Sequence, residues 1–226
     1  MLNSWLDKNY QKVVENRRWL HQHPEVGFDE HETSKYCQKL MQEMGFEIHQ
    51  TKPMQTGFYC DYGNGGGPTL AVRCDLDALP IHEMNTVNYC SKNSGVSHAC
   101  GHDSHMANIL GLASYINDTE QEIPGRLRFI FQPAEEIAPG GAVVMIEGGA
   151  IEGVDHIIGG HILPSLSPRK IGIRYGSMAA AVERIDICLK GPGGHTSRPI
   201  ESVDLIWAQS HLVISLEESI KHHLDQ

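Results

Sequence analysis

Apolar residues recur at helical spacing along the first 45 residues, which predicts two amphipathic helices. The first helix should cover residues 4–22 and bury Leu6, Tyr10, Val13 and Leu20. The second helix should begin at Asp29, with Glu32 as its partner in a capping box, and should end at Gly45.

Shorter apolar runs follow, and their alternation with helical segments is typical of an α/β domain. Strands are predicted over residues 58–62, 69–73, 126–131 and 156–160. Helices are predicted around 106–116 and over 141–147. We therefore expect an open, mostly parallel sheet with helices on both faces.

The pattern changes near Gly176. An alternating strand is predicted over 183–190, a turn over 191–194 and a long helix over 202–224. One strand and one helix cannot bury their own apolar faces. We therefore expect a first domain over 1–178, the beginning of a second over 179–226, and self-association through the apolar face of the last helix.

Composition narrows the function classes. The 226 residues hold 18 Lys and Arg against 28 Asp and Glu, a formal charge of −10 that argues against a nucleic-acid partner. No run approaches the ~18 apolar residues of a membrane span, and no secretory signal is visible at Met1. Six scattered cysteines then indicate free thiols and a cytoplasmic location.

Possible metal ligands follow each of the central predicted strands or stand in the loop between them. They are Asp75 with Asp77, Cys100 with His102, Glu135 with Glu136, and His161. Each alone has an ordinary explanation, such as a buried thiol, a solvated charge pair or a turn residue. Strand ends meet at one edge of such a sheet, so their coincidence favours a transition-metal site. A cysteine nucleophile is the alternative chemistry, but His102 is too close in sequence to Cys100 to suit a catalytic pair.

Six stretches also carry a resemblance to a known family. They are residues 17–25 (RRWLHQHPE), 73–81 (RCDLDALPI), 98–105 (HACGHDSH), 131–136 (FQPAEE), 160–164 (GHILP) and 191–199 (GPGGHTSRP). In this order they resemble the amidohydrolase branch of the dinuclear metallopeptidases, which includes aminoacylase, hippurate hydrolase and the plant auxin-conjugate hydrolases.

The resemblance implies roles for particular residues. The implied metal ligands are Cys100, His102, Glu136 and His161. Glu135 matches the general base and acid, and Asp77 matches a carboxylate that supports the metal cluster. His195 matches a lid-domain histidine that polarises the substrate carbonyl. Asp75 stands where other branches have a histidine ligand, so we do not assign it as a ligand.

The resemblance also implies the reaction and its requirements. The activity would be metal-dependent hydrolysis of the amide bond of N-acyl amino acids or related small amides. A complete site would hold two divalent ions, with zinc or manganese expected and cobalt or nickel also compatible. Residues 1–178 would be the N-terminal part of the catalytic domain. Residues 179–226 would begin an inserted α+β lid domain that forms a homodimer.

Length leaves a second hypothesis open. Compared with the family, the chain would lack the rest of the lid, the second catalytic part and a late histidine of the metal site. The alternative is therefore a truncated, inactive form that binds metal or associates with another chain.

Overall fold

The computed structural model describes residues 1–51, 56–63, 65–179 and 185–224. The chain divides into two compact units, Met1–Arg169 and Lys170–Gln226. The elements of the first unit are α1 (Leu2–Gln22), α2 (His31–Glu43), β1 (His49–Gln50), β2 (Phe58–Tyr62), β3 (Thr69–Asp75), α3 (His102–Asp118), β4 (Arg126–Gln132), α4 (Gly141–Glu147) and β5 (His156–Gly159).

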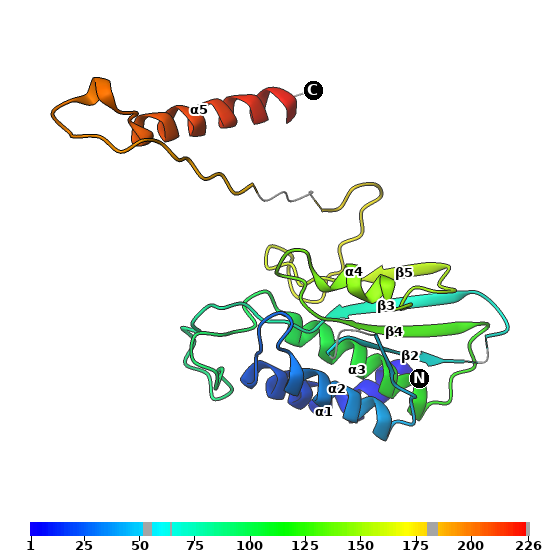
Figure 1. Ribbon diagram of the computed structural model, residues 1–226. Helices are drawn as coiled ribbons and strands as arrows, with labels where there is room; N and C mark the ends of the chain where they lie inside the picture. The colour runs from blue at the N-terminus through cyan, green and yellow to red at the C-terminus, as the bar shows by residue number, and fades with distance from the viewer. Residues whose placement is uncertain (52–55, 64, 180–184, 225–226) are drawn as a thin grey trace. The chain divides into compact units, whose positions relative to one another are not determined.

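The first unit is a layered α/β structure around one sheet with the strand order β1-β2-β4-β3-β5 (Figure 1). The neighbours β4, β3 and β5 run parallel, whereas β1 and β2 run antiparallel along one side. Helices α1, α2 and α3 cover one face, and α4 lies on the other. This arrangement confirms the predicted α/β class and its mostly parallel sheet.

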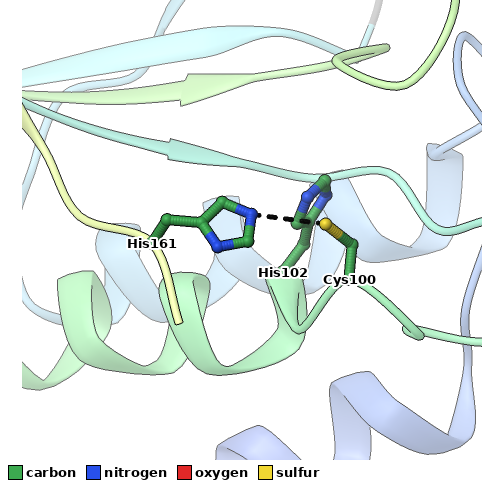
Figure 2. A group of neighbouring side chains, drawn as sticks. All are labelled: Cys100, His102 and His161. Carbon is green, nitrogen blue, oxygen red and sulfur yellow. Dashed lines mark hydrogen bonds between the residues drawn. The ribbon is translucent and has the colours of Figure 1, made fainter. Parts of the chain in front are cut away.

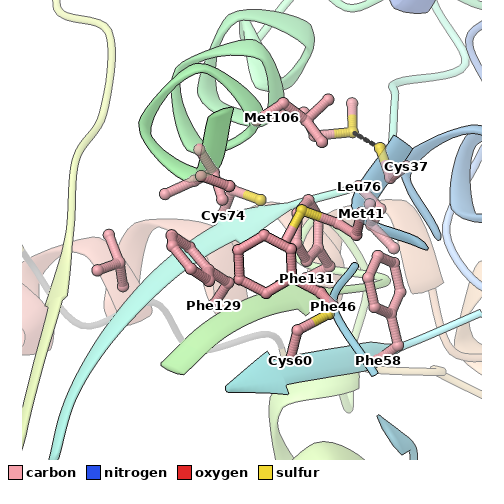
Figure 3. Close-up of a cluster of buried hydrophobic side chains, with 14 of the residues drawn as sticks. Cys37, Met41, Phe46, Phe58, Cys60, Cys74, Leu76, Met106, Phe129 and Phe131 are labelled. Carbon is pink, nitrogen blue, oxygen red and sulfur yellow. Dashed lines mark hydrogen bonds between the residues drawn. The ribbon is translucent and has the colours of Figure 1, made fainter. Parts of the chain in front are cut away.

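The main core lies between the sheet and the three helices. Phe58 of β2 and Phe131 of β4 are paired across the ladder and stack with ring centroids 4.4 Å apart (Figure 3). Along β3, Val72 and Cys74 enter this core, whereas Ala71 packs on the opposite face in the smaller cluster with Met145 of α4. The alternation is the two-residue period of a strand buried on both faces.

Strand register determines which loops meet. Asp75 at the end of β3 is paired with Gln132 at the end of β4, and Gly159 at the end of β5 is paired with Arg73. The three parallel strands therefore end along one edge of the sheet. The segments that follow them emerge there together, as expected for the ligand-binding edge of an α/β sheet.

Two details of the helices differ from the sequence prediction. Helix α1 buries Trp5 and Leu20, but Tyr10 is 63% exposed, so the predicted apolar face was partly wrong. The predicted capping box of α2 was also wrong, because the side chain of Glu25, outside the helix, accepts hydrogen bonds from the backbone N–H groups of Glu32 and Thr33. A carboxylate at a helix start satisfies free amides whatever its place in the sequence.

The second unit contains a short 3-10 helix, η1 (Pro199–Glu201), and α5 (Leu205–Leu224). The strand predicted over 183–190 was wrong for residues 185–190, which have no regular secondary structure, while residues 183 and 184 lie outside the described residues. Helix α5 begins later than predicted because Asp204 Oδ1 accepts the N–H groups of Ile206 and Trp207. Among the described residues, no helix combines the length and apolar character that crossing a bilayer needs.

Candidate metal centre

The segments beyond the parallel strand ends gather several groups that can bind a metal. Three sets place their ligand atoms within 4.8 Å of one another: Cys100 with His102 and His161, His102 with Glu135 and Glu136, and Asp75 with His102 and His105. His102 belongs to all three sets and is therefore the centre of the cluster. The structure thus brings together every predicted site residue of the first unit.

His102 opens helix α3 and is 1% exposed. Its Nδ1 lies 2.8 Å from the backbone carbonyl oxygen of Asp77. A carbonyl can only accept, so Nδ1 carries the proton and Nε2 presents a lone pair. This is the arrangement in which a histidine ligand is usually held by its surroundings.

His161 follows β5 and faces the same point (Figure 2). Its Nδ1 lies 2.7 Å from the carbonyl oxygen of Ile162, which again leaves the lone pair on Nε2. That Nε2 is 3.3 Å from Cys100 Sγ. Two imidazole nitrogens and one sulfur therefore converge, a combination suited to zinc and related transition metals.

Glu135 and Glu136 occupy the turn that follows β4. Oε1 of Glu136 lies 3.7 Å and Oε2 of Glu135 lies 4.0 Å from His102 Nε2. The side chain of Glu135 is 42% exposed and that of Glu136 is 22% exposed, so Glu135 is the more open to solvent. The pair thus offers one carboxylate beside the nitrogen and one that can reach water.

Asp77 holds this turn and His102 together. Its Oδ2 accepts the backbone N–H of Glu136 at 2.9 Å, and its Oδ1 is 3.3 Å from His102 Nδ1. Burial alone would raise the pKa of Asp77, but the adjacent ring of His102 and the N–H groups of Glu136 and Glu135 outweigh burial and lower it. Asp77 therefore stays ionised and supports the cluster through its contacts with His102 and with the backbone of Glu136.

Two buried polar atoms without hydrogen-bond partners among the described residues show whether a cation fits this site. Within the described part of the chain, Nε2 of His102 and Oε1 of Glu136 have no hydrogen-bond partner. Unpaired buried polar atoms are costly, and two that lie 3.7 Å apart can both be satisfied by one cation. The donor set of Cys100, His102, Glu136 and His161 therefore fits a divalent metal.

The charges around Cys100 also favour a bound cation. Burial and the neighbouring carboxylates of Glu136, Glu135 and Asp75 raise the pKa of this thiol to about 12. The pKa of His102 is raised as well, because the hydrogen bond to Asp77 and the charges of Asp75 and Asp77 outweigh the opposing effect of burial. The cluster thus carries an excess of negative charge that a cation would offset.

In the third set, Asp75 and His105 already have hydrogen-bond partners within the protein. Nδ1 of His105 lies 2.7 Å from Asp75 Oδ1, and its Nε2 accepts the N–H of Ile162 at 3.0 Å. Burial alone would raise the pKa of Asp75, but the hydrogen bond from His105 and the charges of His102, Arg73 and His105 lower it to about 2. Asp75 and His105 therefore already bond to each other and to neighbouring groups of the protein, so His102 is the member of this set whose nitrogen has no hydrogen-bond partner among the described residues.

Sequence reasoning assigned no role to His105, although a signal was available. It stands three residues after His102 and therefore lies on the same face of α3. His195 belongs to the second unit, where its Nδ1 lies 2.8 Å from Ser197 Oγ and accepts the Ser197 N–H at 3.2 Å.

Comparison with known proteins gives consistent similarities. The pattern of Peptidase family M20/M25/M40 matches residues 71–223. The chain is 40% identical over 221 residues to an N-acyl-L-amino acid amidohydrolase of Geobacillus stearothermophilus, covering 97% of this chain and 60% of that protein. It is 40% identical over 216 residues to an N-acetylcysteine deacetylase of Bacillus subtilis, covering 95% of this chain and 57% of that protein.

Solved structures agree with the sequence comparison. A Bacillus subtilis protein described as a dinuclear metal-binding peptidase of the M20 family matches with a TM-score of 0.67 and 42% identity. The match covers 71% of this chain and 45% of that one. The chain thus spans little more than half the length of the curated relatives named above.

Proposed function

The chain belongs to Peptidase family M20/M25/M40, and from that premise we propose that it serves metal-dependent hydrolysis of the amide bond of N-acyl amino acids. The observation that carries the proposal is a pair of buried atoms beside Cys100 and His161, His102 Nε2 and Glu136 Oε1, which have no hydrogen-bond partner among the residues that the structure describes. The substrate class follows from the relative that is named for N-acyl-L-amino acids.

Four side chains would hold the cation: Cys100, His102, Glu136 and His161. A divalent cation in such a site lowers the pKa of a bound water toward ~7 and polarises a carbonyl oxygen. Mixed sulfur, nitrogen and oxygen ligands suit zinc, and manganese, cobalt and nickel are compatible. The relative described as dinuclear supports two ions per complete site.

Glu135 would act as general base and then as general acid. Its partly exposed carboxylate lies beside His102 without being buried among the ligands, so it can reach a water molecule at the edge of the cluster. Oε2 would take the water proton and later deliver it to the leaving amine nitrogen. Asp77 would fix the position of His102 relative to the turn of Glu135 and Glu136 through the contacts described above.

The remaining assignments are proposals that rest on the family. His195 would polarise the substrate carbonyl, and residues 179–226 would begin a lid domain that forms a homodimer. Glu135, Asp77 and the four ligands would belong to the catalytic part over 1–178. The six free cysteines suit a reducing cytoplasm.

A second candidate is metal binding or association without turnover. The second unit favours it, because α5 exposes 79% of Ile206, 63% of Trp207 and 57% of Val213, an apolar surface that another chain could cover. In that case the chain would hold metal but release no amine.

Amine release from a panel of N-acyl amino acids separates the two candidates. The purified chain would be assayed with zinc, with manganese and with chelator, beside Glu135→Gln and the control Glu122→Gln. Glu122 is exposed and precedes β4, at the opposite end of that strand from the site. Metal-dependent turnover that is lost only in Glu135→Gln would support the hydrolase. Folded, metal-loaded wild-type protein without turnover would support the alternative.

A further inference from the structure

The loop that carries His161 is held in place by one specific backbone contact. His161 lies beyond the end of β5, in a segment without regular secondary structure. Its own ring contacts only the neighbouring Ile162 carbonyl and Cys100 Sγ among the hydrogen bonds of the described residues. The N–H of Ile162, however, donates to Nε2 of His105 at 3.0 Å. This bond ties the ligand-bearing loop to helix α3.

The ring of His105 is itself fixed from the other side. Its Nδ1 donates to Asp75 Oδ1 at 2.7 Å, so Nε2 is left with the lone pair that accepts from Ile162. Oδ2 of Asp75 accepts from Arg73 Nη1 at 2.7 Å, and Arg73 Nε donates to Gln132 Oε1 at 2.9 Å. A chain of hydrogen bonds therefore runs from the ends of β4 and β3, through a buried imidazole, to the loop after β5.

We propose that His105 is a positioning residue that accepts the N–H of Ile162 and so places His161 opposite Cys100 and His102. The inference rests on the proposed metal centre and deepens it. His105 is 6% exposed, its ring centroid is 4.7 Å from that of His161, and both of its ring nitrogens are used. It therefore supports the centre without being a ligand, as outer partners of metal ligands do.

A matched pair of substitutions separates the two bonds of the ring. In His105→Gln the amide oxygen can replace Nε2 and accept from Ile162, while the donor to Asp75 is lost. In His105→Asn the shorter amide can still donate to Asp75 but cannot reach Ile162. Zinc affinity of the full 226-residue chain would be measured by competition with a chromophoric chelator. Each variant would also be made in a His161→Ala background.

The proposal predicts different results for the pair. His105→Asn should weaken zinc binding about 10- to 100-fold, as loss of an outer partner does, and His105→Gln should stay within about threefold of wild type. In the His161→Ala background, His105→Asn should change zinc affinity by less than about threefold, because its effect passes through the lost ligand. Equal losses in both variants, or an undiminished loss in the His161→Ala background, would overturn the proposal.

Metal-free protein provides a second readout, which also covers a failure of the proposed function. Hydrogen exchange of the Ile162 amide should be slow in wild type and His105→Gln and at least about tenfold faster in His105→Asn. If wild type binds no zinc, the metal centre is refuted while the exchange rates still test the role of His105. Identical exchange in all three proteins would refute that role.

Discussion

Gly101 stands between two proposed ligands, Cys100 and His102, and its replacement by alanine separates backbone strain from ligand placement. Its φ of +86° lies in the left-handed region, which costs a residue with a Cβ about 1–2 kcal/mol. The added Cβ would also lie 3.3 Å from Ile162 Cδ1, so the side chain of Ile162, the residue after His161, must give by a few tenths of an ångström. Gly45 provides the matched control, because its φ is also +86° and no atom of the described residues contacts an added Cβ within 4 Å.

Both glycine variants should therefore lose about 1–2 kcal/mol of the free energy of unfolding, measured by urea denaturation in the presence of chelator. Their zinc affinities should differ: Gly45→Ala should bind zinc as wild type does, and Gly101→Ala about tenfold more weakly, because Ile162 and the flanking ligands move. Chelator competition measures this difference. If Gly101→Ala bound zinc as tightly as Gly45→Ala at the same loss of stability, the contact with Ile162 would not control the position of His161.

Two further predictions concern buried titratable groups. Burial lowers the pKa of His98 to about 4, so the folded chain keeps this ring neutral while the unfolded chain protonates it near pH 6.5. The free energy of unfolding should therefore fall as the pH drops from about 6.5 to 4, and His98 alone should account for about 3 kcal/mol of that loss at pH 4. In urea melts at pH 7 and pH 4, His98→Leu should lose less stability on acidification than wild type. An equal loss in both proteins would contradict a buried, neutral His98. The second group is Glu30, whose Oε1 accepts the Ala134 N–H at 2.7 Å. Burial raises the pKa of its carboxyl group, so the contribution of this carboxyl to the free energy of unfolding is lost as the pH rises through the folded-state pKa. At pH 7, Glu30→Gln should be at least as stable as wild type, whereas Glu30→Met should lose about 1–3 kcal/mol through the unpaired amide; urea melts in which both lose equally would refute the role of the acceptor.

The sheet and the gathering of the site could be predicted from the sequence because both follow from local patterns. The alternation of strands and helices predicts parallel strands, and parallel strands deliver their following loops to one edge. That reasoning alone places Glu135, Glu136 and His161 near His102. It needs only the residue types and their positions relative to the strand ends.

The partners that hold those groups could not be predicted in the same way, because they are distant in sequence. Glu25 caps α2 although Asp29 is nearer, and Glu30 binds the backbone of Ala134 more than a hundred residues away. The link from His105 to Ile162 depends on the register between β3 and β5, which no local pattern encodes. Periodicity identifies the face of an element but not the amide that lies against it.

Cobalt binding tests most directly the claim that Cys100 and its neighbours form a metal centre. The chain would be titrated with Co²⁺ and followed by visible absorption, beside Cys100→Ser and the control Cys90→Ser. Cys90 is also partly buried, but its Sγ donates to the carbonyl oxygens of Asn85 and Val87, away from the ligand groups of the centre. We expect a thiolate-to-cobalt charge-transfer band in wild type and in Cys90→Ser, and no such band in Cys100→Ser. A band that survives in Cys100→Ser, or no cobalt binding by the folded wild-type chain, would contradict it.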